Sequence, residues 1–176
     1  MINYTAYADR VKKSVCAGYL IGLAAEIYAR CKDVRIGAVL FGLGLLTICA
    51  FKLKLFTGMI GEGRLIECID ILLYNAVGVA IAISVLRIFP EALALGVACG
   101  SLMQIGVCLY AKHPWATVLC VAAFLLSGFR HCIALIYYAY QYKFLNWVFI
   151  FFSAVIGNII GAKLVAFGGV KKEENN

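Results

Sequence analysis

Charged residues are scarce in this sequence. Only 14% of its 176 residues are Asp, Glu, Lys or Arg, 64% are hydrophobic, and the mean hydropathy is +0.95. Soluble proteins carry about 25% charged and about 45–50% apolar residues, so a soluble domain is excluded. The composition predicts an integral membrane protein. At roughly 20 residues per crossing, we expect six spans and little mass outside the bilayer.

The groupings of residues that carry enzyme chemistry are also missing. There is no Gly-rich phosphate loop, no Ser/His/Asp arrangement and no carboxylate pair, and the eight cysteines show neither a CxxC motif nor a metal-ligand spacing. We therefore expect no enzyme activity, no cofactor and no metal site. The net charge is +7, but the basic residues are scattered at helix ends, which argues against nucleic acid and favours lipid headgroups and small anions as partners.

We expect a single transmembrane domain at residues 14–168, after a cytoplasmic segment at 1–13 and before a disordered tail at 169–176. No signal peptide is expected, because residues 1–9 are polar and lack an apolar core. With both termini in the cytoplasm, 7 basic residues near helix ends lie inside and 5 outside, a small bias in the direction of the positive-inside rule. We therefore predict a multi-pass protein of the cell (inner) membrane.

Two of the apolar runs are interrupted. The run at 34–51 ends in Lys52-Leu-Lys-Leu-Phe-Thr-Gly58, and the run at 115–140 contains Ser127-Gly-Phe-Arg-His131. Irregular backbone at membrane depth is tolerated only inside protein or beside a water-filled cavity. Alternatively, Lys52 and Lys54 mark a helix that ends at the interface, with side chains reaching the headgroups. The uninterrupted helices are predicted at 14–29, 66–86, 91–110 and 146–167.

The two halves of the chain repeat several residues at a nearly constant spacing. The matches lie 82 or 83 residues apart: Gly18, Leu20 and Tyr28 with Gly100, Leu102 and Tyr110, Phe41 with Phe124, and Asn75-x-x-Gly78 with Asn158-x-x-Gly161. Three spans per half is an odd number, so the copies must face opposite ways. We predict two inverted three-helix repeats, at about 14–87 and 91–168, with a substrate site near the midplane where the broken helices correspond.

A few polar residues stand out inside the spans. His131 is the only histidine in a predicted span, and an intramembrane ionisable residue that exchanges protons near neutral pH is a functional candidate. The alternative is a core histidine bonded to backbone freed at the break. Thr57 offers a hydroxyl to the same cavity or caps a helix. We expect Asn75 and Asn158 to tie helices together through buried hydrogen bonds.

Five segments follow the order of motifs in the formate/nitrite transporter family, which the chain resembles over residues 12–168. They are Leu55-Phe-Thr-Gly58, Tyr74-Asn-Ala-Val-Gly78, Leu95-Gly-Val-Ala-Cys99, Ser127-Gly-Phe-Arg-His131 and Gly157-Asn-Ile-Ile-Gly161. The resemblance implies an all-α, aquaporin-like fold of six helices with helices 2 and 5 broken. It also implies a homopentamer with one pore in each protomer, and passage of small monovalent anions such as formate, nitrite or hydrosulfide.

The resemblance also assigns residues to the pathway. Thr57 and His131 match the family's central polar pair, and Phe124 matches the periplasmic constriction. The cytoplasmic constriction corresponds to Phe41, Leu45 and Phe56. Further residues are candidates for the vestibules or for selectivity: Lys52, Lys54, Met103 and Arg130.

This assignment leads to a hypothesis of proton-linked movement of a weak acid. A bare anion is very costly to bury whereas its neutral acid crosses easily, and a low dielectric raises the pKa of the entering anion. The sequence departs from the family in having Arg130 where an acidic residue is usual, which disfavours a charged His131. Met59, Gly100 and Leu135 stand where the family has asparagine.

Two alternatives stay open at this point. If His131 stays neutral, the same fold serves as a channel for water or another neutral solute. If bulky residues such as Met59 and Leu135 close the pore, the chain is a membrane scaffold that does not transport.

Overall fold

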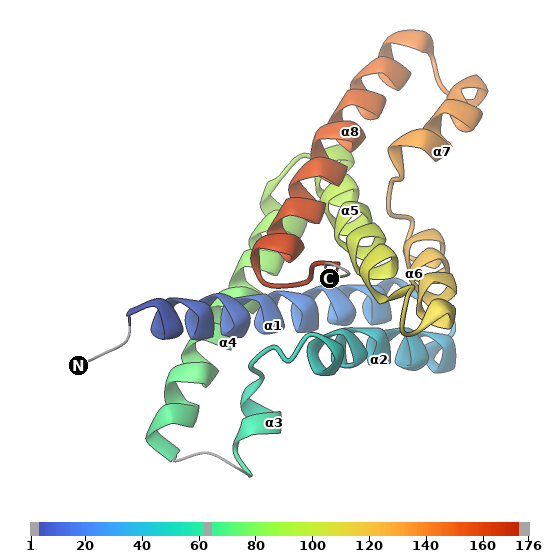
Figure 1. Cartoon of the computed structure of the whole chain (residues 1–176). Helices are drawn as coiled ribbons and strands as arrows, with labels where there is room; N and C mark the ends of the chain where they lie inside the picture. Colours follow the sequence, from blue (N-terminus) through green and yellow to red (C-terminus); the bar gives the residue numbers. More distant parts are fainter. Residues whose placement is uncertain (1–3, 62–64, 173–176) are drawn as a thin grey trace.

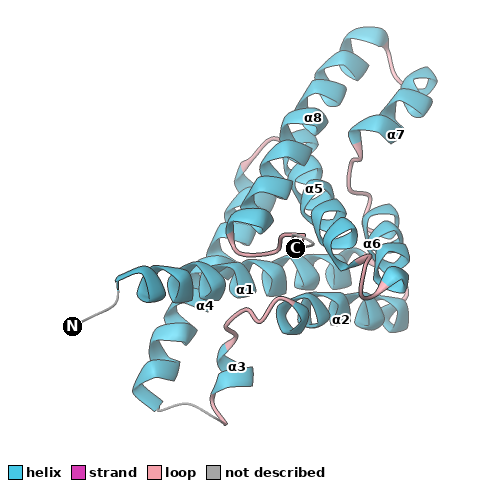
Figure 2. Ribbon diagram, in the orientation of Figure 1, coloured by secondary structure: helices cyan, strands magenta, loops and turns pink. Residues whose placement is uncertain are grey.

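The computed structural model describes residues 4–61 and 65–172, and these residues form helices and no strands (Figures 1 and 2). The all-α class is confirmed. The last four residues of the expected tail and most of the expected turn at 61–64 lie outside the described residues. The elements are α1 (Tyr4–Arg30), α2 (Val34–Ala50), α3 (Phe56–Met59), α4 (Leu65–Ile88), α5 (Glu91–Leu109), α6 (Pro114–Leu126), α7 (Cys132–Tyr137), the 3₁₀ turn η1 (Tyr138–Gln141) and α8 (Phe144–Phe167).

Three of the described helices are long and apolar enough to cross a membrane: Cys68–Ile88 within α4, the whole of α5, and the whole of α8. α2 and α6 are also apolar but shorter. In the apolar 18-residue stretch of α5, 72% of the residues are buried inside the protein, and in the corresponding stretches of α4 and α8 the share is 28% and 22%. α5 is therefore a central helix of a membrane protein, while α4 and α8 present apolar faces outward.

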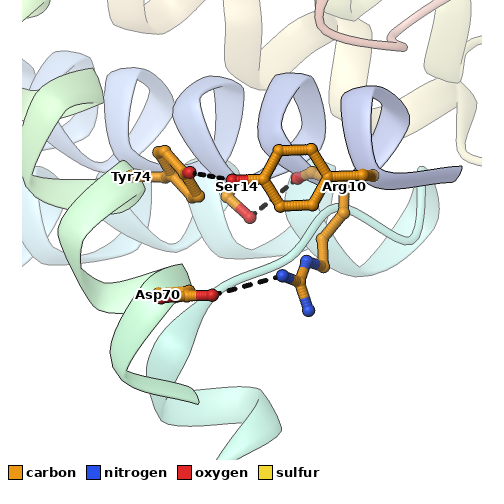
Figure 3. Close-up of polar contacts among 5 residues, drawn as sticks. Arg10, Ser14, Asp70 and Tyr74 are labelled. Atoms are coloured by element: carbon orange, nitrogen blue, oxygen red, sulfur yellow. Dashed lines mark hydrogen bonds and ion pairs between the residues drawn. The ribbon is translucent and has the colours of Figure 1, made fainter. Parts of the chain in front are cut away.

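The first helix begins ten residues before the predicted position at 14, so the basic residues ahead of the apolar run are helical. Lys13 pairs with Asp9 at 2.8 Å, one helical turn away, and Arg10 pairs with Asp70 of α4 at 3.3 Å. Figure 3 shows this junction, where the Ser14 hydroxyl donates to the Arg10 carbonyl at 2.8 Å. Ion pairs to its own turn and to α4 help to hold this polar part of α1 in a helix.

Both predicted interruptions are present, and they share one pattern of backbone hydrogen bonds. After α2, the Leu53 N–H donates to the Ile48 carbonyl at 2.9 Å; after α6, the Phe129 N–H donates to the Phe124 carbonyl at 2.9 Å. Phe129 lies 76 positions after Leu53, and Phe124 lies 76 positions after Ile48. The residue just before each donor has a positive φ, +50° at Lys52 and +69° at Gly128.

These bonds correct one predicted match between the halves. Phe124 is equivalent to Ile48 and not to Phe41, because both Phe124 and Ile48 accept the bond that ends their helix. The spacing falls from 82 in the first helix of each half to 76 at the break. Four of these six residues are lost because α6 has 13 residues and α2 has 17; the other two are lost before α6 begins, since the starts of α2 and α6 are 80 positions apart.

Within each half, the first and third helices cross at a glycine. A Cβ at Gly18 of α1 would overlap the carbonyl of Asn75 in α4, and a Cβ at Gly100 of α5 would overlap the carbonyl of Asn158 in α8. Glycine therefore permits the close crossings visible in Figure 1, where α1 crosses α4 and α5 crosses α8. The crossings bring Asn75 next to α1 and Asn158 next to α5, the first helix of each half.

The core lies where helices of the two halves meet. Leu20, Leu23 and Ile27 of α1 pack with Leu102 and Ile105 of α5, and all five are almost fully buried. The Tyr19 and Ser101 hydroxyls, from α1 and α5, form a buried hydrogen bond at 2.9 Å. These two residues are 82 positions apart, the same spacing that relates Gly18 to Gly100.

Candidate functional site

The irregular segment between α2 and α3, residues 51–55, is called the first break, and the segment between α6 and α7, residues 127–131, is the second. Asn75 of α4 binds the first break to α1 through hydrogen bonds. Its amide nitrogen donates to the Ser14 carbonyl of α1 at 2.7 Å and to the Lys54 carbonyl at 2.9 Å. Its amide oxygen accepts from the N–H of Phe56, the first residue of α3, at 2.9 Å. Both donors and the acceptor of the buried side chain are used, so the irregular backbone between α2 and α3 is satisfied from within the protein.

Asn158 of α8 makes the same three contacts at the second break. It donates to the Gly96 carbonyl of α5 at 2.9 Å and to the Arg130 carbonyl at 2.9 Å, and it accepts from the Cys132 N–H at 3.1 Å. Each asparagine thus joins the first helix of its half to the two sides of the break. Since lipid offers no hydrogen bonds, such a clamp is what irregular backbone at membrane depth requires.

The first break forms one wall of an open groove of about 370 Å³. Three of the predicted pathway residues line it: Leu45, Lys52 and Thr57. Thr57 lies on the four-residue α3 with its side chain exposed. Phe41, the expected neighbour of Leu45 in a constriction, lines a different hollow with Tyr28 and Ala38.

Three further predicted residues have defined places. Phe56 lies at the start of α3, where it is half-buried and its backbone N–H is the group held by Asn75. Met103 of α5 is half-buried and packs against the apolar core. Lys54 contributes its carbonyl to the asparagine clamp, and its side chain is half-buried.

His131 caps the short helix after the second break. Its Nδ1 accepts from the Ala134 N–H at 3.4 Å, and its ring stacks on Phe124 with the ring centres 5.8 Å apart. A lone pair on Nδ1 exists only in the neutral imidazole, so this bond favours the tautomer with its proton on Nε2. The second break therefore presents a half-buried histidine that caps α7 and packs against an aromatic ring.

The second break also carries polar atoms without a partner. Arg130 is fixed by its backbone, since its N–H donates to the Leu95 carbonyl at 3.2 Å and its carbonyl accepts from Asn158. Its Nη1 atom is shielded from solvent and makes no hydrogen bond within the described structure, and the same holds for the hydroxyl of Ser127, which is 4% exposed. An ordered water or an ion is one kind of partner that satisfies buried groups of this kind.

An ion triad centred on the buried carboxylate of Glu26 adjoins this break, and it was not predicted from the sequence. Glu26 is 8% exposed and receives Arg30 at 2.6 Å and Arg87 of α4 at 2.7 Å. The Arg30 guanidinium also lies over the ring of Phe129, 5.9 Å from its centre. Only the four-residue spacing of Glu26 and Arg30 was visible in the sequence. Arg87 is 61 residues from Glu26, so the fold alone brings it there.

No family model, no curated protein and no solved structure matches this chain. The resemblance to the formate/nitrite transporter family therefore stays a prediction from its motifs. Thr57 and His131, the expected central pair, belong to the two different breaks. Figure 1 shows α3 beside α4 and α7 beside α8, at opposite ends of the molecule.

Proposed function

We propose that this chain is a membrane channel or transporter for small monovalent anions or their weak acids, of the formate, nitrite or hydrosulfide type. The observation that carries the proposal is the matched pair of asparagine-clamped breaks, with Asn75 at the first and Asn158 at the second. A scaffold that only spans the bilayer has no need of irregular backbone in two equivalent helices.

The proposed architecture follows from the repeated contacts. Each half supplies a first helix, a broken second helix and a third helix that carries the clamping asparagine. Three crossings per half place the halves in opposite orientations, as in an aquaporin-like fold of six spans. In membrane proteins of this kind, broken helices at corresponding positions of inverted repeats mark the substrate site. The exposed apolar faces of α4 and α8 suit lipid and neighbouring copies in a homopentamer.

The preference for anions rests on the charge at the breaks. Lys52 and Lys54 lie at the first break and Arg130 at the second, and the nearby Glu26 is already paired with two arginines. The unpartnered Nη1 of Arg130 offers a charge-assisted hydrogen bond to an anion. Positive groups at both ends of a pathway raise the local concentration of small anions.

Protons enter the mechanism because a bare anion is costly to bury. An anion drawn in by these charges takes a proton from water or from His131 and crosses between the aromatic side chains as a neutral acid. A proton from His131 comes from its imidazolium form, which returns to the neutral imidazole whose Nδ1 accepts the Ala134 N–H and then regains a proton from water. The hypothesis is therefore proton-linked movement of a weak acid, with His131 and Thr57 in the pathway.

The test is uptake of formate, nitrite and hydrosulfide into liposomes, with and without an inward proton gradient. We expect uptake of at least one anion to rise with the gradient, to be lost in His131→Ala and to need a higher anion concentration in Arg130→Gln. His113→Ala is the matched control, because His113 lies in the turn before α6, outside both breaks. Its uptake should equal that of the wild type.

Other outcomes contradict the proposal. Passage of water or neutral solutes with exclusion of every anion would establish a neutral-solute channel. No passage at all in well-folded protein would establish a scaffold with a closed pore. Uptake that ignores the proton gradient would remove the proton-linked step.

A further inference from the structure

The chain turns back after α8, and its last described residues pack against helices of both halves. We call residues 168–172 the C-terminal strap. Figure 1 shows it, in red, turning from the end of α8 toward α1 and α5. Gly168 lies so close to Cys16 of α1 that a Cβ on it would overlap that side chain, and Gly169 has a φ of +113°. The strap is therefore a defined turn, held close to the body of the protein.

Val170 anchors this strap. Its side chain is fully buried, and its N–H donates to the Val165 carbonyl of α8 at 3.2 Å. Its carbonyl accepts from the amide of Gln104 at 3.1 Å and from the thiol of Cys108 at 3.6 Å, and both of these residues belong to α5. One residue thus joins the end of α8 to α5 through its side chain and through both of its backbone polar groups.

The strap also lies against the first break. A Cβ placed on Gly169 would be 3.7 Å from Cδ2 of Leu53, and Leu53 belongs to the same buried cluster as Val170. Leu53 lines the groove at the first break together with Lys52 and Thr57. The same leucine is therefore in contact with the strap and part of the wall of the groove, so a displaced strap would leave that wall without its support.

An equivalent arrangement is present at the second break. Val170 lies 83 positions after Arg87, which is the spacing that relates the two clamping asparagines. Arg87 belongs to the ion triad whose Arg30 lies over the ring of Phe129 in the second break. Phe129 is the equivalent of Leu53. The end of the third helix of each half thus supports the break of the other half, with charges at the second break and with apolar contacts at the first.

We propose that the C-terminal strap sets the position of the first break, with Val170 as the positioning residue. Val170 holds the strap on α5, Gly169 places it against Leu53, and Leu53 fixes the wall of the groove. Val170 is not among the residues that line the groove, so it acts on the groove only through Leu53. The inference rests on the proposed function only where it takes this groove as part of the pathway.

The experiment is amide hydrogen exchange of the full-length protein in detergent, with the two breaks compared in the same molecule. The amides of Leu53 and Phe129 make equivalent bonds, to the carbonyls of Ile48 and Phe124. Val170→Ala removes two buried methyl groups from the anchor. We expect the Leu53 amide to exchange about tenfold faster in this variant and the Phe129 amide to change by less than about twofold.

The matched control is Val97→Ala, which removes the same two methyl groups from an equally buried position in α5. It should not accelerate exchange at Leu53 more than at Phe129. If Val170→Ala does not fold, Gln104→Leu removes the hydrogen bond to the Val170 carbonyl and should produce a smaller shift in the same direction. Equal acceleration at both breaks, or none at Leu53, would overturn the proposal.

Uptake into liposomes tests the link to the pathway. In Val170→Ala, the anion concentration for half-maximal uptake should rise by a larger factor than the maximal rate changes, because the wall of the groove is displaced. Unchanged uptake despite faster exchange at Leu53 would overturn this link. Absence of uptake in the wild type would contradict the proposed function, and the exchange measurement would still decide the role of the strap.

Discussion

The two breaks use different residues at the same backbone position. Gly128 has φ +69° and Lys52 has φ +50°, in turns with the same hydrogen bonds. The left-handed region costs a residue with a Cβ roughly 1–2 kcal/mol relative to its ordinary conformation, and glycine avoids this cost. Only one of the two breaks therefore has the residue that its backbone favours.

This difference predicts opposite effects of exchanging the residue type. Relative to Lys52→Ala, which keeps a Cβ, Lys52→Gly should raise the free energy of unfolding by about 1 kcal/mol. Gly128→Ala should lower it by a similar amount. Thermal unfolding in detergent measures both. The same stability for Lys52→Gly and Lys52→Ala would show that the positive φ carries no strain.

Some residue roles were visible in the sequence and others were not. The interruptions at Lys52 and at Gly128 follow from polar residues inside apolar runs. The burial of Arg130 Nη1 and the pairing of Glu26 with Arg87 do not, because each depends on helices brought together from distant parts of the chain. A lone charged residue in an apolar sequence gives no sign of its partner.

At the scale of the helices, the asparagines of α4 and α8 decide where the chain can be irregular. The sequence indicated that Asn75 and Asn158 form buried hydrogen bonds, but it gave no indication that both bind the breaks. Their partners there are backbone groups, and every residue has these. No side-chain pattern could therefore identify the carbonyls of Lys54 and Arg130 as the groups that accept from the two asparagines.

Loss of either clamp should destabilise the protein strongly. Asn75→Ala or Asn158→Ala removes three hydrogen bonds to backbone groups, and at about 1 kcal/mol for each bond the free energy of unfolding should fall by about 3 kcal/mol. Asn146→Ala, at an exposed position in the first turn of α8, should change it by less than about 0.5 kcal/mol.

Unfolding in detergent measures this loss, and limited proteolysis locates it. In Asn75→Ala, cleavage should increase between α2 and α3, and in Asn158→Ala between α6 and α7. Uniform sensitivity along the chain in both variants would contradict a local role for the asparagines.

At the scale of the whole molecule, the hydropathy pattern gave the helical class and the approximate helix positions. It did not give the early start of α1, because that part is polar and is held by ion pairs such as Arg10 with Asp70. It also misjudged the match between halves at Phe41, because the shortening of α6 is not visible as a gap in an apolar sequence.

The triad around Glu26 joins α1, α4 and the second break, so its loss should lower the stability of the whole fold. Glu26→Gln leaves two arginines without a counter-charge and should lower the free energy of unfolding by about 2 kcal/mol. This is less than for a fully buried pair because Arg87 is 59% exposed. Asp33→Asn, which breaks the exposed pair with Arg35, should have almost no effect in the same unfolding measurement. Equal effects of the two changes would contradict the structural role of the triad.

The contact between Tyr19 and Ser101 makes the two halves of the chain complementary and not interchangeable. Two positions that are equivalent in the two halves touch one another there. If the two halves were identical, such a position would meet its own copy, Tyr against Tyr or Ser against Ser. One large and one small hydroxyl side chain fill the space, so the halves fit one another at this contact only because their sequences differ.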